Sequence, residues 1–427
     1  MANLKTELWN AFVDSELIGI CDDDCSILPR FLPSSYLPTI HRTCRDITEF
    51  LMRLLSLPSE EIKDIIPSSP IVDYLIDDLA ILTHRRKRVT GSLRFDMAIV
   101  GKPTPKNPPK LLEVNEIGFD GTGRSSYIQE TILKIFPELK KHVRCLDTAL
   151  SETINMRRLG KKFARLHYNY YNWEEQSILM KARKIGLDMK LISPSAFRIE
   201  IEDGCDDLSR AHIRLQNNKV RIGNSPWKPD CFQVSYSFEL GDYKEAPKLF
   251  RDLVRTKTPQ YSPFLTGLIA PKTILTLMAD KDLRQRIIGK SKSHKLDKAI
   301  LPARLLEGNE AYATKHAADL VMKHADGMGG ELVWVGKELL NRIKRITVSK
   351  RKHYVLQDRV RLNTIEVDGI LSRRRRVMAD LGVYIHYDWN GKRFTNFKVG
   401  GFITRATNRS LKVNVSGGGI QVPVMFY

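Results

Sequence analysis

The sequence predicts a mixed fold of the α+β or α/β class, and three observations support that prediction. Residues 1–80 carry apolar residues at three- and four-residue spacing, which is the helical period. Short runs such as Met97–Val100 and Val383–Tyr387 are apolar and rich in strand-forming residues. An Asn390-Gly391 pair between two such runs is a strong signal for a β-hairpin.

The composition is that of a folded protein with a large core. Its 427 residues predict two or three domains at about 100–200 residues each. No run of about 18 apolar residues is present, so we expect no transmembrane helix and no membrane partner. The N-terminus lacks a signal-peptide pattern, and the six cysteines are scattered. We therefore expect a reduced, cytoplasmic chain.

Charge is distributed unevenly along the chain, whose net charge is +20. Residues 1–80 hold 14 acids and 6 bases, whereas the remainder holds 63 bases and 35 acids. This excess of bases favours an anionic partner: nucleic acid, a nucleotide or an acidic substrate. Composition does not choose among these three.

The pattern of elements divides the chain into four parts. In the third part we expect helices at Met156–His167 and Glu174–Ile185, and in the fourth a polar loop at Gly289–Lys295. The parts are an N-terminal helical segment at 1–88, a strand pair and glycine-rich loop at 89–150, an α/β unit at 151–275, and a second mixed segment at 276–427.

Residues 94–115 carry the first candidate site. Arg94 and Asp96 are two residues apart, as are Glu113 and Asn115, and a Pro/Lys/Asn turn at Lys102–Lys110 separates the pairs. Residues two apart on a strand share a face, so a hairpin here gathers all four side chains on one surface. Two carboxylates and an amide oxygen suit Mg²⁺, and a neighbouring guanidinium suits a phosphate. The residues alone leave a solvated polar strand face equally open.

A glycine-rich loop follows this hairpin. Gly118, Gly121 and Gly123 permit close backbone approach to a ligand, and we expect a helix from about Tyr127. Ser125 or Ser126 is a candidate cap for that helix. With Arg124 at the helix start, the loop is a candidate anion site, although its glycine spacing matches no standard phosphate motif.

The fourth part contains residues suited to polyphosphate. Lys323 ends a predicted strand, and glycines follow it at Gly327, Gly329 and Gly330. A lysine ammonium followed by a flexible glycine turn grips phosphate oxygens without side-chain clashes. Lys281, at the start of a basic helix, offers a second ammonium.

Two further positions complete the candidate set. Gln357 follows a predicted strand and is suited to the polar edge of an adenine, and Arg405 follows Gly400-Gly401 and is suited to a γ-phosphate. Each candidate has a structural alternative: a solvated lysine, a β-bulge at the glycine pair, or a surface ion pair for the arginine.

The order of these motifs resembles that of circularly permuted ATP-grasp ligases, of the kind represented by glutathionylspermidine synthetase and related synthase-like proteins. The likeness covers roughly residues 90–427, in motif order only. The matched residues are Arg94, Asp96, Glu113, Asn115, Lys281, Lys323, Gln357, Gly400, Gly401 and Arg405.

The resemblance implies an ATP-grasp fold with a preATP-grasp α/β domain at 151–275. Residues 89–150 would be the metal-binding part of its core, and residues 276–427 the ATP-binding part. It implies ATP-dependent ligation of a small-molecule or peptide carboxylate to an amine through an acyl phosphate, with ATP and Mg²⁺ as cofactors. The resemblance implies that the metal is held by Asp96, Glu113 and Asn115, and that catalysis uses Arg94 and Arg405. It implies that the substrate is bound by Arg124 and Ser125. The implied ATP-binding residues are Lys281, Lys323, Gly327, Gly329, Gly330 and Gln357.

Several alternatives stay open. Lys290 or Lys298 is a candidate for the first ATP lysine in place of Lys281. The basic charge also fits a nucleic-acid-binding protein, or an enzyme with an acidic or RNA-borne substrate. A third reading is a nucleotide-binding ATP-grasp scaffold that does not ligate. The sequence identifies neither the two substrates nor the oligomeric state.

Overall fold

The computed structural model describes most of the chain. The described residues are 5–7, 10, 24–76, 88–116, 121–167, 173–192, 213–217, 219–222, 225–235, 253–327, 332–369, 372–407 and 419–427. Within them, no helix is long and apolar enough to cross a membrane. Gly118, Gly329 and Gly330 lie outside these ranges. The fold is a mixture of helices and several sheets, which confirms the predicted α+β class.

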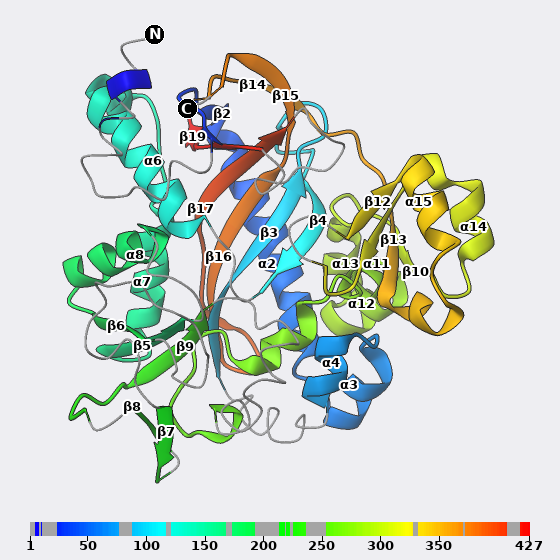
Figure 1. The fold of residues 1–427 in the computed structure, drawn as a ribbon, viewed down its shortest axis with the longest axis horizontal. Coiled ribbons are helices and arrows are strands. Elements are labelled where there is room, and N and C mark those ends of the chain that lie inside the picture. The colour runs from blue at the N-terminus through cyan, green and yellow to red at the C-terminus, as the bar shows by residue number, and fades with distance from the viewer. Residues whose placement is uncertain are drawn as a thin grey trace.

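An eight-stranded sheet, called here the main sheet, forms the centre of the described structure (Figure 1). Its main path runs β1–β18–β17–β16–β3–β4, and β15 and β14 extend it from β17. The strands are β1 Asp24–Cys25, β3 Val89–Ala98, β4 Lys110–Asn115, β14 Thr364–Val367, β15 Arg375–Ala379, β16 Leu381–Trp389, β17 Phe394–Thr407 and β18 Ile420–Val422.

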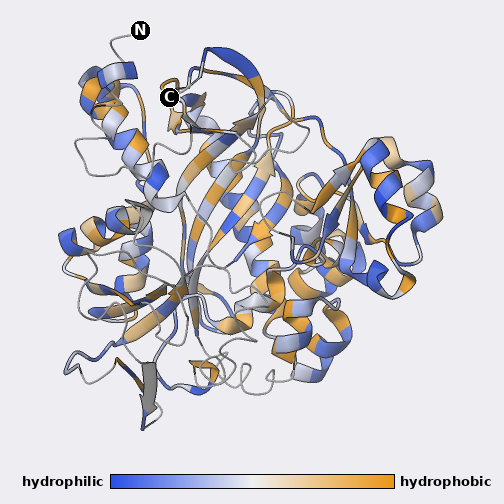
Figure 2. Cartoon of the chain, viewed as in Figure 1, coloured by the Kyte–Doolittle hydropathy of each residue, from blue (hydrophilic) through white to orange (hydrophobic). Residues whose placement is uncertain are grey.

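Alternation along these strands gives the main sheet two different faces. Leu93 and Phe95 are fully buried in the largest hydrophobic core, which includes Phe50 of helix α2 (Leu37–Leu54). Arg94 and Asp96 alternate with them and point to the other face. Figure 2 shows hydrophobic and hydrophilic residues alternating along the central strands. The same pattern that fixes the core therefore orients the polar residues.

A four-stranded sheet, called here the small sheet, lies beside β4 (Figure 1). Its order is β10–β13–β11–β12, with bounds β10 Ala303–Leu305, β11 Leu320–His324, β12 Val333–Val335 and β13 Tyr354–Asp358. The surrounding elements are η4 Phe264–Ile269, α11 Ile274–Ala279, α12 Lys281–Ile288, α13 Lys290–Leu296, α14 Glu310–Lys315, η5 Ala317–Asp319, α15 Gly336–Ile343 and η6 Val348–His353.

A parallel sheet of three strands lies on another side of the main sheet, in the order β6–β5–β9. Its strands are β5 Lys162–His167, β6 Asp188–Ile192 and β9 Cys231–Ser235. A separate hairpin pairs β7 Ile213–Gln216 with β8 Lys219–Ile222, and Asn217, with a positive φ, lies in the turn between them. The helices around it are α6 Thr122–Ile135, η3 Pro137–Lys141, α7 Thr148–Arg157 and α8 Trp173–Lys184.

The N-terminal region is built into the core. Besides η2 Ser34–Tyr36 and helices α2, α3 (Ser59–Ile65) and α4 (Pro70–Ile76), it contributes two short strands that the sequence analysis did not expect. These are β1 and β2 (Arg30–Leu32), which pair in parallel with β18 and with β19 (Val424–Phe426). The two ends of the described chain therefore share sheets.

Two predicted elements were wrong. The helix expected at Met156–His167 ends with α7 at Arg157, and residues 162–167 form strand β5 because they pair on both sides with parallel strands. The polar loop expected at Gly289–Lys295 is helix α13, because Ser293 and Leu296 are buried on one helical face. In both segments tertiary pairing overrides local composition.

Candidate functional site

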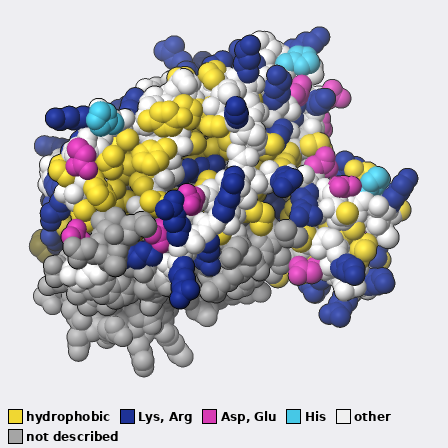
Figure 3. Space-filling view, turned by 90° about the horizontal axis from the view of Figure 1, so that it is seen from above, with side chains coloured by type: hydrophobic (Ala, Val, Ile, Leu, Met, Phe, Trp, Pro, Cys, Tyr) yellow, Lys and Arg dark blue, Asp and Glu magenta, His cyan; other side chains and the backbone are white. Residues whose placement is uncertain are grey.

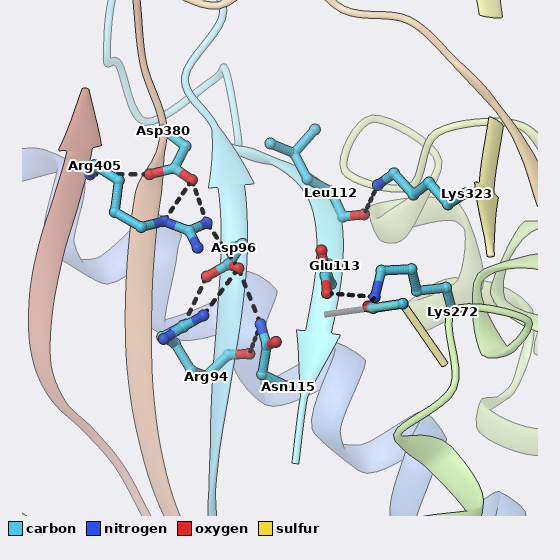
Figure 4. Close-up of polar contacts among 10 residues, drawn as sticks. Arg94, Asp96, Leu112, Glu113, Asn115, Lys272, Lys323, Asp380 and Arg405 are labelled. Carbon is cyan, nitrogen blue, oxygen red and sulfur yellow. Dashed lines mark hydrogen bonds and ion pairs between the residues drawn. The ribbon is translucent and has the colours of Figure 1, made fainter. Parts of the chain in front are cut away.

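The predicted hairpin is confirmed, and it gathers the four expected side chains. Strands β3 and β4 are antiparallel, with Arg94 opposite Asn115 and Asp96 opposite Glu113. The pairing then shifts, so that Met97 lies opposite Leu111 and Leu112 has no partner. This β-bulge turns the Leu112 carbonyl away from the regular ladder. Figure 4 shows the side chains around it.

Asp96 is the centre of the polar network. Its carboxylate accepts from Arg94 Nε at 2.8 Å and Nη2 at 3.2 Å, and from Asn115 Nδ2 at 3.0 Å. Arg405 Nη2 lies 2.8 Å from Oδ2 of the same carboxylate. Three of these contacts meet Oδ2 and one meets Oδ1, so the protein satisfies most of the acceptor positions of this carboxylate.

Asp380 is a fifth member of this network that sequence reasoning missed. Its carboxylate accepts from Arg405 Nε at 3.0 Å and also from Nη2, and the Arg405 backbone N–H donates to it at 3.1 Å. Buried Arg30 donates to the Asp380 carbonyl at 2.6 Å from the opposite end of the chain. A lone aspartate in Ala379-Asp380-Leu381 carries no recognisable motif, so only the folded structure identifies it.

The ionisation of these groups follows from their pairing. Burial raises the pKa of Asp96, but the charges of Arg405 and Arg94 outweigh burial and hold that pKa below its usual value. Burial raises the pKa of Asp380, and the positive charge of Arg405, which lowers that pKa, does not outweigh burial together with the negative charge of Asp96. Burial lowers the pKa of Arg405, yet Asp380 and Asp96 outweigh it and keep the guanidinium charged.

The small sheet supplies Lys323 and Gln357 from neighbouring strands. Lys323 Nζ donates to the bulged Leu112 carbonyl at 2.8 Å and to Gln357 Oε1 at 2.9 Å, and Gln357 Nε2 donates to the Leu111 carbonyl at 3.3 Å. Lys323 is 7% exposed. Burial lowers the pKa of Lys323 to about 8, because neighbouring Glu113 only partly offsets the loss of hydration.

Lys272 is the second residue that sequence reasoning missed. Its ammonium lies 3.0 Å from Glu113 Oε1 and donates to the Gly327 carbonyl, and its backbone N–H donates to Ala325 at 2.9 Å. It therefore joins β4 to the turn after β11. Nothing in the segment Ala270-Pro271-Lys272 distinguishes this lysine from a solvated one.

The other lysine candidates are placed differently. Lys281 is the first residue of α12, after the N-cap Asp280, and its side chain is exposed. The side chains of Lys290 and Lys298 are exposed as well. Besides Lys323, the structure therefore brings Lys272 to the network. It does not bring Lys281, Lys290 or Lys298 there.

The candidates from the glycine-rich loops take structural positions. Ser125 lies inside α6, whose N-cap is Gly121, so the expected cap was wrong. The Ser125 hydroxyl is fully buried and donates to the Phe402 carbonyl of β17, while Arg124 is half-buried on the same helix.

The Gly400-Gly401 pair lies at a β-bulge, where the register of β16 and β17 shifts. A Cβ added at Gly401 would lie 1.7 Å from Thr148 Oγ1, and one added at Gly400 would lie 2.2 Å from His386. The pair therefore allows α7 and His386 to pack closely on β17, and this agrees with the structural alternative given above.

The donor set fits Mg²⁺ only in part. Asp96 fits less well than the other two, because cations and an amide N–H contact both of its oxygens, three of them at Oδ2. Glu113 keeps a carboxylate that is 26% exposed, and Asn115 Oδ1 has no hydrogen bond in the described chain. No group of three or more His, Cys, Asp and Glu suited to a metal occurs among the described residues. Two oxygen donors plus phosphates and waters are a common Mg²⁺ arrangement.

The assembled network has more cations than anions. The cations are Arg94, Arg405, Lys272 and Lys323, and the carboxylates are Asp96, Glu113 and Asp380. Guanidinium and ammonium groups at the junction of two sheets suit a phosphorylated or carboxylated ligand. The arrangement is thus suited to a polyanion with at most a two-ligand metal.

Comparison with known proteins is informative for the fold. A scan against protein-family models and a search of curated proteins find no match. The solved structure of a glutathione synthetase-like effector from Globodera pallida, in the apo form, is similar at 12% identity and a TM-score of 0.69. The match covers 95% of this chain and 90% of that chain. It shows that this chain shares the fold of that glutathione synthetase-like effector, while the likeness to ATP-grasp ligases and to glutathionylspermidine synthetase stays a prediction.

Proposed function

We propose that this chain is an ATP-dependent carboxylate–amine ligase with a circularly permuted ATP-grasp core. The observation that carries the proposal is the junction of the two sheets. There Lys323 and Gln357 reach β4 at its bulge, beside Glu113 and facing the same side as the Asp96–Arg405 network. The hairpin precedes the small sheet by about 200 residues in sequence, and this order is what a permuted core would require.

In this proposal the triphosphate lies between the two sheets. Lys323 exchanges its neutral acceptors for phosphate oxygens, which retains its hydrogen bonds and adds charge attraction. Lys272 exchanges the Glu113 carboxylate and the Gly327 carbonyl for phosphate oxygens, which leaves Glu113 to the metal. Arg405 uses Nε and Nη2 for Asp380 and Asp96, which leaves its Nη1 to meet the transferring phosphoryl group. Gln357 and the adjacent strand offer polar groups to the base. Gly327, in the turn after β11, lies beside the phosphates, and Gly329 and Gly330 stay predicted contributors.

The proposed reaction has two steps. A substrate carboxylate oxygen attacks the γ-phosphorus, and the bond from that phosphorus to the ADP oxygen breaks. The amine nitrogen then attacks the acyl carbon, loses a proton and displaces inorganic phosphate. Arg94 and Arg124 are the proposed carboxylate partners, with Ser125 supporting the helix that carries Arg124. Water exclusion matters, because an acyl phosphate is lost by hydrolysis.

In this proposal magnesium has two protein ligands in place of the three that the sequence predicted. Glu113 and Asn115 would hold the ion on β4, and when bound it would neutralise phosphate charge. Asp96 instead fixes the two guanidinium groups. The prediction that Asp96 is itself a metal ligand is therefore not carried into the proposal.

ADP release with a panel of carboxylic acids and amines tests the proposal. Wild type should release ADP only when both substrates are present, and Glu113→Gln should lower the rate at least about tenfold, as expected when one charge-stabilising group is lost. Metal-dependent turnover that is unchanged in Glu113→Gln would contradict the site. The exposed Glu307→Gln serves as a matched control.

One observation favours a second candidate, a nucleotide-binding scaffold that does not ligate. Asp96 is the most buried of the three predicted metal ligands, and its charge is already neutralised by Arg94 and Arg405. Calorimetry with ATP separates the two candidates. Binding of ATP without ADP release for any acid–amine pair supports the scaffold, whereas release with a defined pair supports the ligase.

A further inference from the structure

The helical layer outside the small sheet is separate from the site. Alternate residues of β11 point to opposite faces, so Lys323 reaches β4 while Met322 packs with Leu339 and Ile343 of α15. Figure 1 shows α14 and α15 on the side of the small sheet that faces away from β4. A ligand on this outer layer would therefore not contact the junction of the two sheets.

This layer carries a dense group of unpaired cations. Residues 337–352 contain seven lysines and arginines and a single acid, Glu338. We call them the outer basic face: Lys337, Arg342, Lys344, Arg345, Lys350, Arg351 and Lys352. Arg351 pairs with Glu310 at 2.9 Å, but within the described chain the five lysine and arginine residues Lys337, Lys344, Arg345, Lys350 and Lys352 form no ion pair. Figure 3 shows lysine and arginine side chains gathered on the lobe at the right.

Aromatic rings stand among these cations. The Arg342 guanidinium lies 4.9 Å from the Trp334 ring, and the Arg304 guanidinium lies 3.9 Å from the Tyr312 ring. Both rings are half-buried at the edge of the hydrophobic core under α15. Guanidinium planes and aromatic rings beside a positive surface are the groups on which unpaired bases stack.

We propose that the outer basic face binds single-stranded nucleic acid, with its cations on the phosphates and its arginine–aromatic pairs beside the bases. An anionic membrane is the weaker fit, because membrane binding grows with exposed apolar area. Of the large hydrophobic side chains exposed in the described structure, Val348 alone lies within this face. The inference is independent of the ligase proposal, because it uses none of the residues at the sheet junction.

Fluorescence anisotropy with a labelled oligouridylate of about 16 nucleotides tests this inference. If the five unpaired cations contact phosphates, affinity should fall on the order of 100-fold between about 50 and 200 mM salt. The variant Lys344→Glu/Arg345→Glu/Lys350→Glu should bind weakly and with a shallower salt dependence. The matched control is Lys134→Glu/Lys140→Glu/Lys141→Glu, which makes the same charge change at exposed positions of α6 and η3.

The control variant should keep the wild-type salt dependence, and both variants should bind ATP as the wild type does. Equal weakening in the two variants would overturn the inference, because it would show only an effect of net charge. A salt dependence unchanged by the first variant would also overturn it. So would binding to phosphatidylserine vesicles without binding to the oligonucleotide. If the wild-type protein does not bind ATP, the ligase proposal is refuted and the nucleic-acid proposal is unaffected.

Discussion

The two sides of the candidate site neutralise their charges in different ways. On the main sheet, Arg94, Asp96, Arg405 and Asp380 pair with one another, so each buried charge faces an opposite charge. On the small sheet, the acceptors of the Lys323 ammonium among the described residues are a backbone carbonyl and an amide oxygen. The pKa values reflect this contrast, since that of Arg405 is raised and that of Lys323 is lowered to about 8.

This difference separates a fixed half of the site from an adaptable half. Carboxylate–guanidinium pairs with several hydrogen bonds are rigid and costly to break when buried. A lysine on neutral acceptors gains charge attraction when an anionic ligand replaces those acceptors. We therefore expect the main sheet to set the geometry of the site and the small sheet to respond to the ligand. Four predictions follow the contrast from its largest expected effect to its smallest.

Removing the central carboxylate should have the largest effect on stability. Asp96→Asn leaves Arg94 and Arg405 buried beside a neutral amide, and the free energy of unfolding should fall by about 3–5 kcal/mol. Urea denaturation measures the change. Glu113→Gln, at a carboxylate that is partly exposed, should cost about 1 kcal/mol or less. Similar losses in the two variants would remove the distinction between the two halves.

The two lysines at the junction of the sheets, Lys272 and Lys323, should affect ligand binding more than stability. Lys272→Ala should weaken ATP binding on the order of 10- to 100-fold, as expected for one charge-assisted contact. Lys281→Ala removes an exposed lysine nine positions away and should leave the affinity unchanged. Titration calorimetry compares the two. If only Lys281→Ala weakens ATP binding, Lys281 is the ATP-binding lysine, as the sequence suggested.

The pH dependence should identify Lys323. Its pKa is lowered from 10.5 to about 8, so its charge, and with it ATP affinity, should fall as the pH rises through about 8. Lys323→Arg, whose guanidinium stays charged, should flatten this profile. Because the unfolded chain binds the extra proton between about pH 8 and 10.5, this group should make the wild type more stable as pH rises across that window. An identical binding profile in Lys323→Arg would assign the titration to another group.

The smallest effect concerns α12, which lies outside both halves. Asp280 accepts from the N–H groups of Asp282 at 2.9 Å and Leu283 at 3.0 Å, so Asp280→Ala should lower the free energy of unfolding by about 1 kcal/mol. ATP affinity should not change. A change in affinity as large as that of Lys272→Ala would mean that this helix belongs to the site after all.

Local patterns in the sequence were sufficient for the hairpin and for the face on which its polar residues lie. The alternation of Leu93, Arg94, Phe95 and Asp96 fixes which residues enter the core, so it also fixes which ones face the site. The Asn390-Gly391 turn between β16 and β17 is equally local. The same signal failed at residues 156–167, where pairing with two neighbouring strands decided for β5.

Tertiary structure alone decided the partners of these residues. Asp380 and Lys272 have no motif around them. They reach the network only because β16 pairs with β17 and because the segment before α11 bonds to the turn after β11. The role of Asp96 changed for the same reason, since a second guanidinium arrives from a strand about 300 residues away. Periodicity specifies the direction of a side chain, but the charge that it meets depends on long-range contacts, and these have no local signature.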